Sequence, residues 1–332
     1  MTTFDLPAAP RLLFHAELSP VQGKRFQPTG FPDVGAGVYT LPDGTEQLLV
    51  ESTQSVANRL EAACWDPVEN DLVASLRGLP YVRVNDAQGQ LLTTSVQEAH
   101  RLNSPYVERT EFFEKDLKGA ISFDEKKPHD RTKLVAALAR FDIGCLLHGV
   151  FLESIAGVLR IPRALSGFIE ATGASRVNTG GVKNDRVQAG KDEEAGRTAK
   201  EGFGNVPFHR TEFVAGNIFA YFNLDLAQIR GYRLGAEMER LLLALSLFKV
   251  RRFLADGLRL RTACDLMVEK IVVRAPEGLE LPSLDEVVNA LPGLIKSAQR
   301  HFASPAVTTA TFVETEKRPK AQTPRQTKGA AS

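Results

Sequence analysis

The stretch from residue 172 to residue 211 most constrains how this 332-residue chain can fold. It reads TGASRVNTGGVKNDRVQAGKDEEAGRTAKEGFGNVPFHRT, which is polar and rich in glycine. Too few apolar side chains are present here to form a core of their own. Strand-like apolar patterns stand on both sides of it, at 158–171 and 212–226. We therefore predict an insertion that projects from the fold or is mobile.

The rest of the chain alternates strand and helix patterns. Residues 11–18 alternate strictly, with Leu12, Phe14 and Ala16 on one side, which predicts a strand with one apolar face. The other expected elements are a short strand at 47–50, a helix at 53–65 capped by Ser52, a hairpin at 79–94, a short helix near 96–102, mixed helix at 131–156, strands at 158–165, 167–171 and 212–226, a helix at 235–253, a strand after Gly257, and a last helix at 283–302 interrupted at Pro292. This order predicts an α+β fold expanded from a ferredoxin-like core, with helices on one face of a sheet.

Composition sets limits on partners and environment. The chain carries 41 basic and 40 acidic residues, so any argument for nucleic-acid binding has to be local. Three widely spaced cysteines without a CxxC pair fit a reducing cytoplasm. No apolar run reaches membrane-spanning length, so we expect a cytoplasmic protein without a membrane partner. Its length allows one enlarged domain as readily as two.

A loop at residues 19–37 follows the first strand and is rich in proline and glycine. Within it, Gln22, Lys24, Arg25 and Phe26 offer an amide, two cations and a ring. Cations hold phosphates and a ring can stack on a base, which favours contact with a nucleic acid. The alternative is a surface turn whose Phe26 belongs to the core.

Two further basic elements strengthen this interpretation. Residues 174–191 contain Arg176, Lys183 and Arg186 with few acidic neighbours. After Gly257, Arg259 and Arg261 alternate along a predicted strand and so share one face. Cations combined with glycines suit contact with a sugar-phosphate backbone, although the cations near Arg252 also suit a helix end.

The sequence lacks three common catalytic and phosphate-binding motifs. It has no GxxxxGK[ST], HExxH or GxSxG, and its six histidines lack metal-ligand spacing. We therefore expect no cofactor, no metal and no catalytic residue.

Several sequence segments along the chain resemble the backbone RAMP subunit of type I-G (formerly I-U) CRISPR effector complexes, also called Cascade complexes. The matching strings run in order from Leu18 to Leu266: LSPVQGKRFQPTGFPDVG, ESTQSVANRLE, SVQEAHRLNSPY, LLHGVFLE, SRVNTGGVKND, GFGNVPFHRTEF and RLRTACDL. The resemblance implies a modified RNA-recognition-motif fold that binds CRISPR RNA without cleaving it. It also implies further copies of the chain, other effector subunits, and a target DNA strand paired with the guide as partners.

The resemblance gives a domain layout. Residues 1–315 would form a single RAMP domain, with a palm at about 10–171 and 212–302 and a thumb at about 172–211. The basic tail at 316–332 has almost no apolar residues and is expected to be disordered.

The resemblance also groups the candidate RNA-binding residues by position. The palm would supply Gln22, Lys24, Arg25, Phe26, Ser55, Asn58, Arg59, Arg259 and Arg261, and the thumb would supply Arg176, Asn178, Lys183, Asn184 and Arg186. The main alternative is a metal-dependent endoribonuclease of the RAMP superfamily that uses Asp33 in the first loop. A metabolic α+β enzyme is a third possibility.

Overall fold

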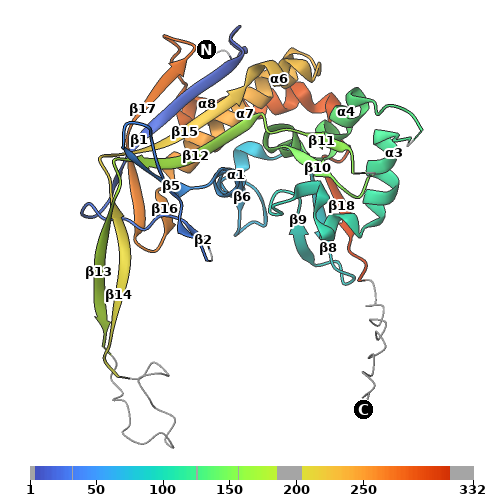
Figure 1. The fold of residues 1–332 in the computed structure, drawn as a ribbon. Helices are drawn as coiled ribbons and strands as arrows, with labels where there is room; N and C mark the ends of the chain where they lie inside the picture. The colour runs from blue at the N-terminus through green and yellow to red at the C-terminus, as the bar shows by residue number, and fades with distance from the viewer. Residues whose placement is uncertain (1–3, 32, 125, 156, 185–203, 315–332) are drawn as a thin grey trace, which may run out of the picture.

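The computed structural model describes residues 4–31, 33–124, 126–155, 157–184 and 204–314. Its main element is a seven-stranded sheet in the order β16-β17-β1-β15-β12-β5-β4, in which every neighbouring pair is antiparallel (Figure 1). The strands are β1 (Arg11–Pro20), β4 (Val38–Thr40), β5 (Glu46–Glu51), β12 (Leu165–Thr172), β15 (Asn217–Asp225), β16 (Leu258–Arg261) and β17 (Cys264–Ala275). The described residues thus form the expected α+β fold.

Alternation along the strands gives this sheet two different faces. Leu12, Phe14 and Ala16 of β1 are buried, as are Ala220 and Phe222 of β15, on the face that helices cover. Those helices include α1 (Thr53–Ala62), α6 (Leu226–Gly231) and α7 (Ala236–Ala255), and α8 (Leu284–Ala298) packs on α7. None of the described helices combines the length and apolar character needed to cross a membrane.

A two-stranded ribbon projects from the sheet between β12 and β15 (Figure 1). Its strands β13 (Ser175–Lys183) and β14 (Val206–Val214) pair antiparallel, from Ser175 opposite Val214 to Lys183 opposite Val206. The ribbon buries few side chains, as the polar sequence of this insertion predicts. Residues 185–203, with the predicted site residue Arg186, lie outside the described residues, as does the tail from 315 onwards.

Residues 65–161 form a second group of elements between α1 and β12, which the last strand joins (Figure 1). Their strands are β6 (Trp65–Asp66), β7 (Asp71–Leu72), β8 (Tyr81–Asn85), β9 (Leu91–Thr94), β10 (Val150–Leu152), β11 (Leu159–Ile161) and β18 (Val307–Thr311), and their helices are α2 (Pro105–Glu108), α3 (Lys118–Ile121), α4 (Arg131–Phe141) and α5 (Gly144–His148). β8 pairs with both β9 and β18, and β10 pairs with β11. The predicted hairpin at 79–94 is confirmed.

Several predicted elements differ from the structure. The strand expected at 212–226 bends at Ala215–Gly216, where β14 ends and β15 begins. The strand expected after Gly257 is the β16–β17 hairpin, because Ala263 turns the chain with a φ of 58°. α8 continues through Pro292, whose ring is exposed while Leu291 and Ile295 hold the helix to the core.

The helix expected at 96–102 is absent from this described stretch, which forms turns and a 3₁₀ turn at Arg101–Asn103. Arg101 adopts a φ of 53°, which is incompatible with a helix. This backbone places its guanidinium against Glu61 of α1, with Nε to Oε1 at 2.8 Å and a second nitrogen to Oε2 at 2.5 Å. Both side chains are buried, so the ion pair joins α1 to the second group of elements.

We predict that Arg101→Met destabilises the protein by about 3–5 kcal/mol, because it leaves the Glu61 carboxylate buried without its partner. Urea unfolding measures the effect. Arg77→Met is the matched control, since the Arg77 ion pairs are exposed and such pairs contribute at most ~1 kcal/mol. Adding Glu61→Gln to Arg101→Met should recover part of the loss. Equal unfolding midpoints for the two arginine variants would contradict this role.

Candidate nucleic-acid interface

Glu51 organises the first part of the candidate interface. It ends β5 and is 2% exposed, yet three hydrogen-bond donors reach its carboxylate. Ser55 Oγ and an Arg261 guanidinium nitrogen donate to it, and Arg59 Nε lies 3.4 Å from Oε1. Predicted residues from α1 and β16 therefore meet at one buried carboxylate that the sequence analysis did not identify.

The same two arginines hold backbone carbonyls of neighbouring segments. Arg59 donates to the carbonyl of Leu260 at 2.6 Å, and Arg261 donates to the carbonyl of Gln27 at 3.1 Å. Burial lowers the pKa of both guanidinium groups. Their hydrogen bonds are thus directed into the protein, where they position the loop after β1 against β16.

Glu212 organises the base of the ribbon. It lies on β14, is 5% exposed, and accepts from Arg25 at 3.1 Å and from Thr179 Oγ1 at 2.9 Å. Arg210 also pairs with it. Burial would raise the pKa of Glu212, but the hydrogen bonds from Arg210 and Thr179 and the charges of Arg210 and Arg25 outweigh burial and lower it.

Backbone hydrogen bonds fix the loop between these two carboxylates. The amide of Phe26 donates to the carbonyl of Phe213 at 2.9 Å, and the reverse bond is 3.0 Å long. On the other side, the amide of Gln27 donates to the carbonyl of Ala263 at 2.7 Å. Three basic elements that are far apart in the sequence therefore lie together: the loop after β1, the ribbon base and the β16–β17 hairpin.

Exposed polar side chains lie on the loop after β1, on α1, on β16 and on the ribbon. Gln22 and Lys24 are exposed on the loop, and Asn58 is exposed on α1, where it accepts from Gln54 at 2.9 Å. Arg259 is exposed on β16 and lines, with Arg59, a cavity of about 250 Å³. The predicted ribbon residues within the described chain are all exposed: Arg176, Asn178, Lys183 and Asn184.

Phe26 requires a correction. Its ring is 1% exposed and belongs to the hydrophobic core, so it offers no face to a base. The loop turns inward after Lys24 and Arg25, which are exposed, so that Phe26 and Pro28 are both buried. Core packing is therefore the role of Phe26, and its proposed part in RNA binding is wrong.

Sequence reasoning missed both buried carboxylates. Glu51 directly precedes the N-cap Ser52 and follows the apolar run Leu48–Val50, and Glu212 directly precedes Phe213. An acidic residue inside an apolar strand pattern has to find cations when it is buried. That signal could have identified the residues that fix the interface.

The described residues define an α+β protein with a projecting ribbon and with exposed cations around the base of that ribbon. Residues 12–176, about half of the chain, match the family described as CRISPR-associated protein GSU0053, from β1 to the start of β13. The chain belongs to this family, which confirms that it is a CRISPR-associated protein.

Two solved structures resemble the chain weakly. A CRISPR RNA-guided surveillance complex, pre-nicking, has a chain with 12% identity and a TM-score of 0.42, over 86% of this chain and 89% of that one. A second CRISPR RNA-guided surveillance complex gives 12% identity and a TM-score of 0.36, over 86% and 84%. No curated protein matches the sequence.

We predict that Phe26→Ala destabilises the protein by about 3–5 kcal/mol, the cost of emptying a buried aromatic site. Phe26→Leu keeps most of the buried volume and should cost less than ~1.5 kcal/mol. Urea unfolding tests both values. Because the ring is buried in the core, Phe26→Leu should bind any RNA that the parent protein binds with unchanged affinity. Selective loss of RNA from a stable Phe26→Leu variant would restore the stacking role.

The lowered pKa of Glu212 predicts a pH-dependent contribution to stability. The ionised carboxylate stabilises the fold fully above the ordinary glutamate pKa of about 4.3 and loses this effect as the pH falls through the lowered value. Glu212→Gln should therefore cost ~2 kcal/mol at pH 7, the value of charge-assisted hydrogen bonds. Urea unfolding of both proteins from pH 7 to pH 3 should show the difference shrinking at the acid end. A constant difference would contradict the ionised network.

Proposed function

We propose that this protein is a non-catalytic backbone subunit of a type I-G DNA-targeting surveillance complex, where it binds CRISPR RNA. One observation carries the proposal: exposed cations of the loop, the ribbon and β16 surround a site that two buried carboxylates hold together. Membership of a CRISPR-associated family supports it. Copies of the chain would lie side by side along the guide, whose bases pair with the target DNA strand.

We propose that the strands β17-β1-β15-β12 are a ferredoxin-like core of the RNA-recognition-motif type. The chain order β1, α1, β12, β15, α7, β17 and the all-antiparallel pairing support this assignment. In that core the ribbon is the thumb, and the loop with α1 and β16 belongs to the palm. Residues 1–315 then make up a single domain.

Phosphate contact is the proposed mode of binding. Lys24, Arg176 and Arg259 are exposed cations, whereas Arg59 and Arg261 hold the surface in shape through Glu51. Phosphates are the same in every nucleotide, so these contacts position a guide without reading its sequence.

Assembly with other chains is supported by apolar side chains on the ribbon. Val182 is 57% exposed and Phe208 is 53% exposed, both near the described end of the ribbon. Large exposed apolar side chains that cluster on a projecting element favour contact with another protein surface. The balanced net charge of +1 lets neighbouring copies approach without strong repulsion.

We predict that Lys24→Gln combined with Arg259→Gln weakens guide binding equally for guides of different sequence. Each lost phosphate contact should lower the slope of log K against log salt by about 0.7–0.9. Filter binding over a series of salt concentrations measures both effects. Arg25 is left unchanged, because it also holds Glu212.

Lys115→Gln combined with Arg77→Gln removes two exposed cations elsewhere and should leave binding unchanged. A loss that depends on guide sequence would contradict phosphate contact. A protein that never retains CRISPR RNA during purification would end the proposal.

The endoribonuclease alternative gains no support from a described feature. Asp33 is exposed in the turn between β2 (Gly30–Phe31) and β3 (Gly35–Ala36), with a φ of 65°. Across the described residues, no group of three histidine, cysteine or acidic side chains is placed to hold a metal. Incubation of guide RNA with Mg²⁺ and either the parent protein or Asp33→Ala separates the two functions.

A further inference from the structure

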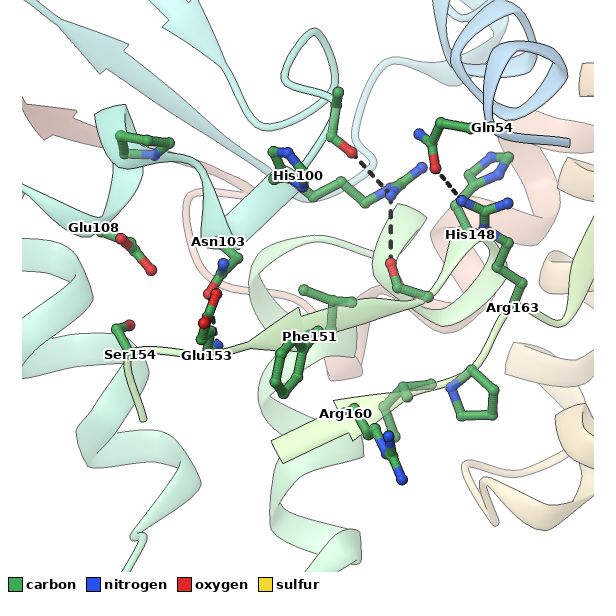
Figure 2. Close-up of a pocket in the computed structure, with 17 residues that line it drawn as sticks. Gln54, His100, Asn103, Glu108, His148, Phe151, Glu153, Ser154, Arg160 and Arg163 are labelled. Carbon is green, nitrogen blue, oxygen red and sulfur yellow. Dashed lines mark hydrogen bonds between the residues drawn. The ribbon is translucent and has the colours of Figure 1, made fainter. Parts of the chain in front are cut away.

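A large cavity lies beside α1, apart from the candidate RNA-binding residues. Its volume is about 1010 Å³, and its walls come from Gln54 of α1, the turn at Ala99–Glu108 and the β10–β11 hairpin (Figure 2). No residue predicted from the sequence to bind RNA lines it. Sites for small molecules usually enclose about 300–1,000 Å³, so the cavity is large enough for a nucleotide.

One end of the cavity is basic. Arg163 lies here beside Gln54 and His148, and its guanidinium forms no ion pair with a carboxylate among the residues that the structure describes, while Arg160 lies farther along the wall, next to Phe151 (Figure 2). Arg163 is half-buried, and its hydrogen-bond partner is the neutral amide oxygen of Gln54. Burial and the charge of Arg101 lower the pKa of Arg163, and the charge of Glu61 opposes them. A partly desolvated cation without a hydrogen-bonded carboxylate favours an anionic ligand.

A buried imidazole adds a donor at this end. Lys249 Nζ lies 2.9 Å from His148 Nε2, and an ammonium group has only donors, so Nε2 accepts and the ring proton lies on Nδ1. His148 Nδ1 has no hydrogen-bond partner within the described part of the chain. His148 is 1% exposed and lies in the cavity wall. Burial lowers its pKa, and the charges of Lys249, Arg101 and Arg163 lower it further. The Nδ1–H group is therefore an unpaired donor within the wall at this end.

The middle and the opposite end have different chemistry. Phe151 is 44% exposed and stands opposite Arg160 in the β10–β11 pairing. In Figure 2 its ring lies between the basic end and a group formed by Glu108, Asn103 and Glu153. Asn103 Oδ1 accepts from the amide of Glu153 at 2.9 Å, which fixes this group. Carboxylates accept hydrogen bonds from amino groups.

We propose that this cavity binds one nucleotide whose base carries an exocyclic amino group. Its phosphate lies at Arg163, its base stacks on Phe151 beside Arg160, and its amino group donates to Glu108. A nucleotide carries its phosphate, its base and the amino group of that base in this order. The cavity presents a cation, an aromatic ring and a carboxylate in the same order. This site reads a base, which the phosphate contacts around Glu51 and Glu212 do not.

Calorimetric titration of the RNA-free protein with adenosine 5′-monophosphate tests the proposal. We expect saturable binding of one molecule per chain and weaker binding of uridine 5′-monophosphate. Arg163→Gln and Phe151→Ala should each weaken binding at least about tenfold, which corresponds to ~1.4 kcal/mol. Arg163→Lys, which keeps the charge, should retain part of the affinity and shows that the site still folds. Phe151 is substantially exposed, so its truncation leaves the core intact.

Two controls separate this site from the guide-binding surface. Lys24→Gln with Arg259→Gln should bind adenosine 5′-monophosphate as the parent does, even if it no longer holds a guide. Protein loaded with RNA shows the source of the ligand: loss of mononucleotide binding assigns the site to a nucleotide of the strand, and unchanged binding assigns it to a free nucleotide. Absence of saturable binding, equal binding of both mononucleotides, or binding that neither variant weakens would overturn the proposal.

Discussion

The buried Glu51 carboxylate is the constraint on which the interface depends. A carboxylate buried at the end of β5 requires positive partners, and it obtains them from α1 and from β16. Those partners in turn reach the carbonyls of Leu260 and Gln27. The cost of burying one charge is thus offset by contacts that fix a helix, a strand and a loop in one arrangement. Lys24 and Arg259 are displayed to solvent on that frame.

Glu212 repeats the same principle at the root of the ribbon. Arg25 joins it from the loop, while Arg210 and Thr179 join it from the ribbon itself. Loop and ribbon are therefore coupled by charge as well as by the backbone pairing of Phe26 with Phe213. The arginines that a basic-patch argument would assign to phosphates differ in their tasks. Arg59 and Arg261 hold the surface in shape through Glu51, Arg25 is exposed and also holds Glu212, and Arg176 and Arg259 face outward.

Local patterns predicted much of the fold, and long-range contacts decided the rest. The alternation in β1, the Ser52 cap of α1 and the apolar stripe of α7 are signals within a single segment, and each element formed as expected. The turn at Arg101 was missed because its left-handed backbone is fixed by Glu61, forty residues away. The candidate cations were recognisable from their type, but Phe26 and the roles of Arg59 and Arg261 depend on neighbours that no segment contains.

The place of the ribbon in the sheet allows its length to change independently of the core. β13 and β14 leave and re-enter between β12 and β15, which remain paired from Leu165 opposite Leu224 to Thr172 opposite Asn217. Removing matched residues from both ribbon strands leaves that register untouched and shortens the ribbon by about 3.4 Å per pair. Pairs removed in twos also keep each side chain on its original face. The ribbon is in effect an adjustable spacer, whose span evolution or an engineer can set in steps of about 7 Å.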